Sequence, residues 1–309
     1  MRWVIIGSSG YIGSALCRYL VDRGLPVLSV SRRGEHMEGA DHQQIPEYSD
    51  EWFRGLFKAG DRIVYAAGLA SIPGCRQQPE LADWLNCRLP VALLELANGA
   101  GAESFLYLSS VKAKKVLCGG IACEDSGQPA SDPYGQSKWR AEQRLLAYPG
   151  KIRVNVLRPA AVYGEYGGKG GVQGVHRSRA FAWKSGLRRL SRYFPFVPAT
   201  GYRSFVAIDD LLVAIALLEE RACDGDIFIA AEPAYYDLAA IGSAASGRHM
   251  KSSCIMTLFI MLPFEILAAL GVKAAILDAQ RSELYSAARL KTRLAWQPRV
   301  RYVEFLRRG

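Results

Sequence analysis

Residues 3–13 read WVIIGSSGYIG, an apolar run followed by glycines at positions 7, 10 and 13. Glycines at this spacing, between a strand and a helix, let the backbone turn tightly and approach a pyrophosphate. N–H groups at the start of the helix then stabilise the phosphate charge. The GxxGxxG spacing differs from the commoner GxGxxG and is specific only in this strand–turn–helix setting. It predicts a dinucleotide-binding loop made of Gly7, Ser9, Gly10, Tyr11, Ile12 and Gly13.

Outward from this loop, apolar strand-like runs alternate with helical patterns. Runs rich in Val, Ile and Leu, joined by helices, indicate a parallel sheet covered on both faces. The expected strands are Trp3–Ile6, Val27–Val30, Arg62–Ala66, Phe105–Leu108, Ile152–Leu157 and Asp226–Ala230. The predicted fold class is α/β, a Rossmann-type doubly wound parallel sheet.

The basic, glycine-rich stretch from Gly164 to Arg203 interrupts this alternation, as does the chain after Glu232. We therefore expect residues 1–163 and 202–232 to form the dinucleotide-binding domain, and residues 164–201 and 233–309 a smaller, discontinuous substrate-binding lobe. Residues 167–192 fit either a mobile lid over a diphosphate or a solvated loop leading into a basic helix. Residues 259–270 are expected to pack within the lobe or to form a dimer seam.

Composition narrows the class further. The chain has 309 residues, of which 50% are apolar and 22% charged, and these globular values exclude a disordered, collagen-like or coiled-coil protein. Seven cysteines without CxxC pairs indicate reduced thiols and a cytoplasmic location. Four histidines without a ligand spacing give no reason to expect a metal. Pro263 and Glu265 interrupt the apolar run 254–272, so no integral membrane span is expected.

The net charge of +10 suggests an anionic ligand: nucleic acid, phospholipid or a phosphorylated metabolite. No long Lys/Arg run and no nucleic-acid-binding motif accompanies this charge. We expect a phosphorylated small molecule and no nucleic-acid partner.

The expected second strand is followed by Ser31-Arg32-Arg33, where NAD-binding folds usually carry an acid. A carboxylate would repel a 2′-phosphate, whereas a guanidinium can bind it through two hydrogen bonds. These three residues predict NADP as cofactor, with NAD as the alternative. A solvated arginine pair on a loop would look the same in sequence.

Tyr134 and Lys138 lie four residues apart and share a face if this segment is helical. An ammonium beside a phenol favours the phenolate and lowers the tyrosine pKa, as a general acid/base requires. Tyr-x-x-x-Lys is common in surface helices and gains specificity from an upstream hydroxyl, which Ser109-Ser110 offers.

Together these residues resemble the extended short-chain dehydrogenase/reductase family, in its NAD-dependent epimerase/dehydratase branch that modifies nucleotide sugars. Further motifs follow in family order along nearly the whole chain. They are Tyr65-Ala66-Ala67-Gly68, Asn86, Tyr107-Leu108-Ser109-Ser110, Tyr134-Gly135-Gln136-Ser137-Lys138, Leu157-Arg158-Pro159, Arg203–Asp210 and Leu294-Ala295-Trp296-Gln297-Pro298.

The resemblance implies a role for each site residue. Tyr134 would exchange a proton with the sugar oxygen, Ser110 would hydrogen-bond the same oxygen, and Lys138 would lower the Tyr134 pKa and bind the nicotinamide ribose. Asn86 would support the proton relay. Cofactor contacts are further implied for Ala66, Ala67, Gly68 and Pro159, and substrate phosphate contacts for Arg203 and Arg281.

Plainer interpretations remain open for three of them. Ser110 could only end a strand, Asn86 could be a satisfied polar group in its helix, and Arg203 could pair with Asp209 or Asp210. The sequence also departs from the family at Val111-Lys112, and at Ile45–Tyr48, where an adenine-contacting Asp is missing.

We expect the protein to catalyse NADP-dependent oxidoreduction at a hydroxyl or keto carbon, C4, of a nucleotide-diphosphate sugar. The expected activity is that of a 4-keto-sugar reductase. One alternative is a nucleotide-sugar 4-epimerase. The other is a non-catalytic NADP-binding regulator. A homodimer is compatible with the resemblance.

Overall fold

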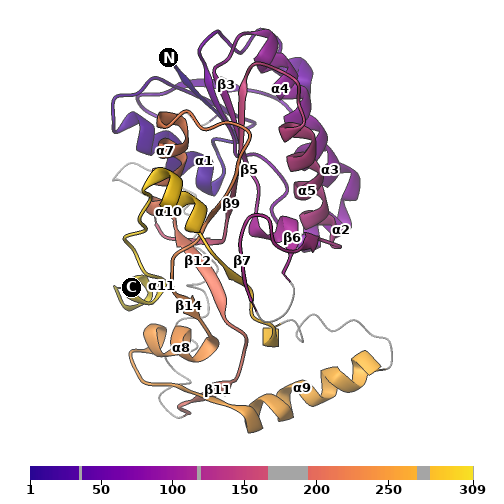
Figure 1. Ribbon diagram of the computed structural model, residues 1–309, viewed down its shortest axis with the longest axis vertical. Coiled ribbons are helices and arrows are strands. Elements are labelled where there is room, and N and C mark those ends of the chain that lie inside the picture. Colours follow the sequence, from indigo (N-terminus) through magenta and orange to yellow (C-terminus); the bar gives the residue numbers. More distant parts are fainter. Residues whose placement is uncertain (35–36, 117–119, 166–193, 270–278, 309) are drawn as a thin grey trace.

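The computed structural model describes residues 1–34, 37–116, 120–165, 194–269 and 279–308 (Figure 1). Its centre is a seven-stranded sheet in the order β13-β9-β5-β4-β1-β2-β3, with every neighbouring pair parallel. The strands are β1 Trp3–Ile6, β2 Val27–Ser31, β3 Asp41–Gln44, β4 Arg62–Tyr65, β5 Ser104–Leu108, β9 Arg153–Pro159 and β13 Ile227–Ala230. The predicted doubly wound parallel sheet is confirmed.

The six expected strands are all present, with ends that differ by at most two residues. The strand that was not expected is β3, whose sequence is DHQQ and whose side chains are mostly exposed. It pairs with β2 along one side only, at the edge of the sheet, so it needs no apolar run to be stable.

Alternate residues of each central strand face opposite layers of helices (Figure 1). Ile5 packs with the layer that contains α1 (Tyr11–Val21) and α7 (Ile208–Glu220). Ile6 packs with the layer that contains α4 (Leu89–Gly99) and α5 (Pro133–Leu146). In this second layer the chain also forms α2 Ile72–Gln77, α3 Pro79–Asp83 and a π-helical turn Trp84–Arg88.

Short strands and helices complete the chain. Three strands, β10 Ala161–Tyr163, β12 Arg203–Ala207 and β14 Tyr235–Tyr236, form a separate sheet. Paired strands elsewhere are β6 Lys114–Lys115 with β8 Gln128–Pro129, β7 Ile121–Ala122 with β16 Leu284–Tyr285, and β11 Phe196–Pro198 with β15 Lys251–Ser253. Short 3-10 turns are at Asp50–Phe53 and Val111–Ala113, and the later helices are α8 Leu238–Ser246, α9 Cys254–Ala269, α10 Ala288–Leu294 and α11 Tyr302–Arg308.

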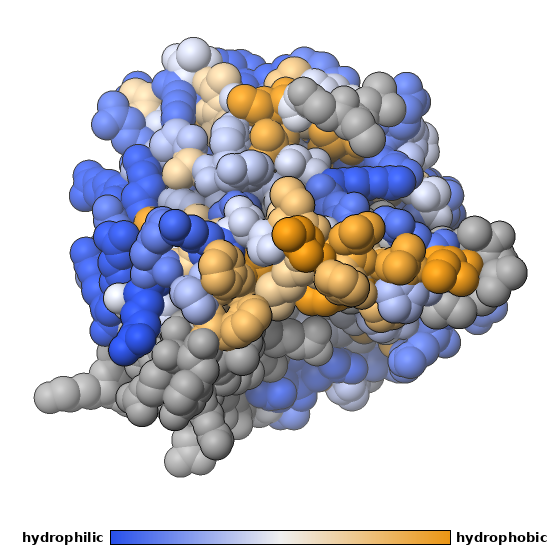
Figure 2. Space-filling view, turned by 90° about the horizontal axis from the view of Figure 1, so that it is seen from below, coloured by the Kyte–Doolittle hydropathy of each residue, from blue (hydrophilic) through white to orange (hydrophobic). Residues whose placement is uncertain are grey.

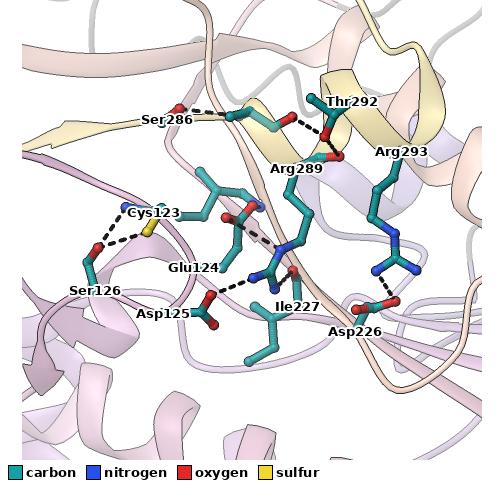
Figure 3. Close-up of polar contacts among 12 residues, drawn as sticks. Cys123, Glu124, Asp125, Ser126, Asp226, Ile227, Ser286, Arg289, Thr292 and Arg293 are labelled. Carbon is teal, nitrogen blue, oxygen red and sulfur yellow. Dashed lines mark hydrogen bonds and ion pairs between the residues drawn. The ribbon is translucent and has the colours of Figure 1, made fainter.

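Helix α10 returns to the main sheet after the chain has left it (Figure 3). Arg289 forms an ion pair with Asp125 at 2.6 Å and donates to the Ile227 carbonyl at 3.0 Å. Arg293 pairs with Asp226 at 2.5 Å. These contacts, with the buried Trp296, fasten the C-terminal part of the chain to β13 and α7. The division into domain and lobe stays a prediction.

Within the described parts of the chain, no helix is long and apolar enough to cross a membrane. The expected lid at 167–192 falls outside the described residues. Six of the seven cysteines are described, and these six are free thiols.

Candidate functional site

The glycine loop after β1 has a shape that side chains would block. Gly7 has φ +90°, and a Cβ there would lie 2.6 Å from the Ala67 backbone nitrogen. A Cβ on Gly13 would lie 2.3 Å from the Gly7 carbonyl oxygen. Gly10 directly precedes α1, and no side chain caps the helix there. The close backbone packing of this loop and the N–H groups at the start of α1, which no side chain caps, fit a dinucleotide pyrophosphate.

Other predicted cofactor residues lie at the carboxyl ends of β4 and β9. Ala67 is buried against Gly7, and Gly68 follows with φ +145°. Pro159 ends β9 and is buried. The Tyr11 hydroxyl, however, donates to the Gly164 carbonyl at 2.8 Å, so this side chain ties α1 to the chain after β10.

Arg32 and Arg33 are exposed on the loop that follows β2. Ser31 is buried, and its hydroxyl donates to the Arg33 carbonyl at 2.9 Å, so its side chain shapes the loop from inside. The Arg32 guanidinium lies over the Tyr48 ring at 5.5 Å. Tyr48 belongs to the segment that departs from the family pattern, and it gives Arg32 an aromatic support.

The polar strand β3, missed in the sequence, holds this arginine loop. The His42 ring bonds the Ser29 hydroxyl through Nδ1 at 2.8 Å and the Arg33 carbonyl through Nε2 at 2.9 Å. Gln44 donates to the Arg32 carbonyl at 3.2 Å. The backbone that carries both guanidiniums is thus fixed by two side chains of β3.

Tyr134 and Ser110 come together where β5 and α5 meet. Asp132 caps α5 by accepting from the Gly135 N–H at 3.0 Å, and Tyr134 lies in the first turn. A side-chain hydrogen bond with Ser110 lowers the Tyr134 pKa, but burial raises it more, and the net shift is upward. The expected net lowering by Lys138 is therefore wrong for this structure, since burial prevails.

Lys138 points inward from the next turn of α5. Its ammonium donates to the Leu108 carbonyl at 2.8 Å and lies 4.6 Å from the centre of the Tyr107 ring. Burial lowers the pKa of Lys138 to about 8, against the opposing effect of the Glu142 carboxylate. A buried ammonium with this pKa is easily discharged above neutral pH.

Asn86 lies at the centre of the π-helical turn and is fully buried. Its amide oxygen accepts from the Leu69 N–H at 2.9 Å, and its Nδ2 donates to the Ser137 hydroxyl at 3.0 Å. A Cβ on Gly68 would lie 2.4 Å from the Asn86 oxygen and 3.6 Å from the Lys138 nitrogen. Asn86 thus joins the loop after β4 to α5, next to Lys138.

Ser109 faces away from Tyr134 and into a buried ion pair. Its hydroxyl donates to Glu142 at 2.5 Å. Arg158 binds the same carboxylate through two nitrogens, at 2.8 and 2.5 Å, and both charged side chains are almost fully buried. This occupation of Ser109 leaves Ser110 as the hydroxyl next to Tyr134. Sequence reasoning missed Glu142, although it continues the Tyr134/Lys138 spacing by one further turn.

Arg203 and Arg281, predicted to contact substrate, lie side by side. The Arg203 guanidinium donates to the Arg281 carbonyl and, at 3.3 Å, to that of Ala279. Glu283 lies 4.0 Å from Arg203 and forms an ion pair with Lys112 at 2.5 Å. The Lys112–Glu283 pair joins residues 171 positions apart in the sequence, so no local pattern predicts it.

The fold described above is that of NAD(P)-dependent enzymes of the extended short-chain dehydrogenase/reductase kind. The chain belongs to the NAD dependent epimerase/dehydratase family, whose match covers residues 3–230.

Solved structures of several such enzymes share the fold across 99% of this chain. UDP-glucose 4-epimerase of Thermotoga maritima, solved with UDP-glucose, is 19% identical with a TM-score of 0.75 and is covered over 96% of its length. The Thermus thermophilus UDP-glucose 4-epimerase in complex with NAD is 21% identical with a TM-score of 0.74, covered over 97%. RMD of Pseudomonas aeruginosa, complexed with NADPH, is 19% identical with a TM-score of 0.69, covered over 97%.

Among curated proteins, an uncharacterised chloroplast protein of Arabidopsis thaliana is 26% identical over 177 residues. The match spans 53% of this chain and 51% of the plant protein. The chain thus corresponds to about half the length of that relative.

Proposed function

We propose that the protein reduces a keto carbon, C4, of a nucleotide-diphosphate sugar with NADPH. The observation that carries this proposal is the contact of Tyr134 with Ser110, on the turn of α5 before the buried Lys138. Related folds solved with UDP-glucose and with NADPH support the substrate class and the cofactor class.

Tyr134 is the proton donor in this proposal. Burial raises its pKa, so the phenol keeps its proton at neutral pH and can give it to a carbonyl oxygen as negative charge develops there. Ser110, hydrogen-bonded to Tyr134, shares that charge and stabilises the transition state. A bound nicotinamide supplies the hydride for the carbon.

Lys138 and Asn86 act around this pair. Lys138 presents a cation beside the loop after β4, where a ribose hydroxyl can replace the Leu108 carbonyl as hydrogen-bond partner. We assign Asn86 a positioning part, since its amide already binds Leu69 and Ser137. Arg203 and Arg281 would meet the substrate diphosphate.

The preference for NADP rests on Arg32 and Arg33. Replacing both by alanine removes the two guanidiniums that would bind the 2′-phosphate. We expect the dissociation constant for NADPH to rise about tenfold to a hundredfold, with that for NADH nearly unchanged. Fluorescence titration of both cofactors measures this, with exposed Arg54→Ala as control. Equal weakening of NADPH and NADH would contradict the assignment.

The reaction itself is tested by NADPH fluorescence with a panel of UDP-, dTDP- and GDP-linked 4-keto sugars. Stoichiometric loss of NADPH on one of them is expected. Interconversion of sugar epimers without net loss would instead establish the 4-epimerase, the alternative that the solved epimerase structures favour. Cofactor binding without turnover, unaffected by Tyr134→Phe, would establish a regulator.

The proposal also covers the division of labour along the chain, its location and its assembly. Residues 1–163 and 202–232 would bind the cofactor and the rest of the chain the sugar. The cytoplasm is proposed because the described cysteines are free thiols. A homodimer rests on the family resemblance alone.

A further inference from the structure

Helix α9 carries an apolar stripe that no described part of the chain covers. Its five members are large side chains with exposed fractions between 46% and 74%: Ile255, Leu258, Phe259, Leu262 and Ile266. The spacings of three, four and seven residues place them on one face of the helix. No described residue packs against this face, so the expected packing within the lobe is not seen there, and the expected dimer seam stays a prediction.

The stripe lies at the end of the molecule farthest from the main sheet. Figure 1 shows α9 running across this end, and Figure 2, which views the same end from below, shows an orange apolar band across it. A planar surface could touch α9 along its length without meeting the sheet or its covering helices.

Aromatic side chains extend the apolar area beyond α9. Strand β11, which contacts α9, carries Phe196 at 41% exposure, and Phe194 just before it is 49% exposed. Phe196 pairs in register with Lys251 of β15, the strand that leads directly into α9. Aromatic rings and a lysine thus lie at the start of the stripe, a combination typical of the boundary between lipid tails and headgroups.

The charge around the stripe is positive. Arg248 and Lys251 are both exposed just before α9. Glu265 is the exposed acid on α9, near the other end of the stripe. Exposed apolar area beside clustered cations fits an anionic lipid surface.

We propose that α9 binds the surface of an anionic membrane, with Leu258 and Phe259 inserted among the lipids and Arg248 and Lys251 on the headgroups. The described part of α9, Cys254–Ala269, has 16 residues, and Pro263 and Glu265 interrupt its apolar sequence, which favours an orientation along the surface. A second copy is the less favoured occupant, because each copy carries a net charge of +10 and would bring its own Arg248 and Lys251 to the contact.

The test is flotation of the full chain with vesicles of phosphatidylcholine alone and of an equal mixture with phosphatidylglycerol. We expect binding to the mixture, weakened by added salt, and little binding to phosphatidylcholine alone. The double variant Leu258→Ser/Phe259→Ser should lower the partition coefficient on the order of a hundredfold. Its matched control is Leu25→Ser/Leu81→Ser, which removes two exposed leucines from the main domain and should bind like the wild type.

Charge reversal gives a second, independent measure. Arg248→Glu/Lys251→Glu should lower binding to the mixed vesicles about tenfold or more, whereas exposed Arg221→Glu should not. Thermal unfolding checks that each variant folds like the wild type.

Three results would overturn the proposal. The first is that the wild type fails to bind the mixed vesicles at low salt. The second is that the Leu258/Phe259 variant binds them as well as the wild type does. The third is that neither protein binds vesicles, while light scattering shows a dimer for the wild type and a monomer for the variant. The last result would identify a second copy as the occupant.

Discussion

Lys138 shows how burial sets the chemistry of a single residue. The side chain is 5% exposed, and burial lowers its pKa from 10.5 to about 8. Between these two values the unfolded chain binds more protons than the folded chain, so the free energy of unfolding rises with pH there. Below pH 8 the whole cost of burying the ammonium is present, on the order of 3 kcal/mol.

We expect Lys138→Met to abolish turnover and yet to raise the free energy of unfolding at neutral pH, by up to about 3 kcal/mol. The gain should shrink as the pH rises above about 8 and disappear only well above 10.5, where the unfolded lysine also loses its proton. Urea unfolding at neutral and at alkaline pH measures this, and exposed Lys151→Met should change stability by less than about 0.5 kcal/mol. A loss of stability at neutral pH in Lys138→Met would contradict the argument.

At the scale of elements, β5 and β9 carry two similar buried groups at their opposite ends. At the carboxyl end, Ser109, directly after β5, and Arg158 of β9 bind Glu142. At the amino end, Ser104 of β5 binds Glu219, and Arg153 of β9 lies 4.0 Å from it. Both carboxylates are fully buried, but only Glu142 lies on the helix that carries Tyr134 and Lys138. Substitutions of Glu142 and of Glu219 can therefore be compared to separate effects on catalysis from effects on stability.

Glu142→Gln removes the charge that raises the Lys138 pKa. We expect the alkaline loss of NADPH oxidation to begin at a lower pH than in the wild type, together with a stability loss of about 3–5 kcal/mol from the unpaired Arg158. Ser109→Ala removes only one hydrogen bond to Glu142 and should destabilise the protein less than Glu142→Gln. Glu219→Gln should leave the pH–rate profile in place. Identical profiles for Glu142→Gln and Glu219→Gln would show that Glu142 has no influence on the site.

At the scale of the whole molecule, the sequence is sufficient to predict those parts of the fold that depend on consecutive residues. The glycine loop and the apolar strands were predicted because their residues are consecutive and their burial follows from the pattern. Strand β3 was missed because an exposed edge strand can be polar, and its function in holding Arg32 and Arg33 depends on pairing with β2.

The missed parts of the site depend on contacts between distant segments. The Lys112–Glu283 pair joins residues 171 positions apart, and the clamp of α10 on Asp125 joins residues 164 apart (Figure 3). The pKa of Tyr134 is raised by burial, and the spacing of Tyr134 and Lys138 in the sequence does not predict how deeply Tyr134 is buried. The exposure of one face of α9 could not be predicted either, because an apolar helix has the same sequence pattern whether or not another element covers it.

The most direct test of the proposed chemistry compares NADPH oxidation by the wild type and by Tyr134→Phe on whichever 4-keto sugar is accepted, with NADPH affinity measured on the same samples. If Tyr134 is the proton donor, the rate should fall about a hundredfold to ten-thousandfold, while the dissociation constant for NADPH stays within about threefold of the wild type. A variant that oxidises NADPH at the wild-type rate would contradict the proposal.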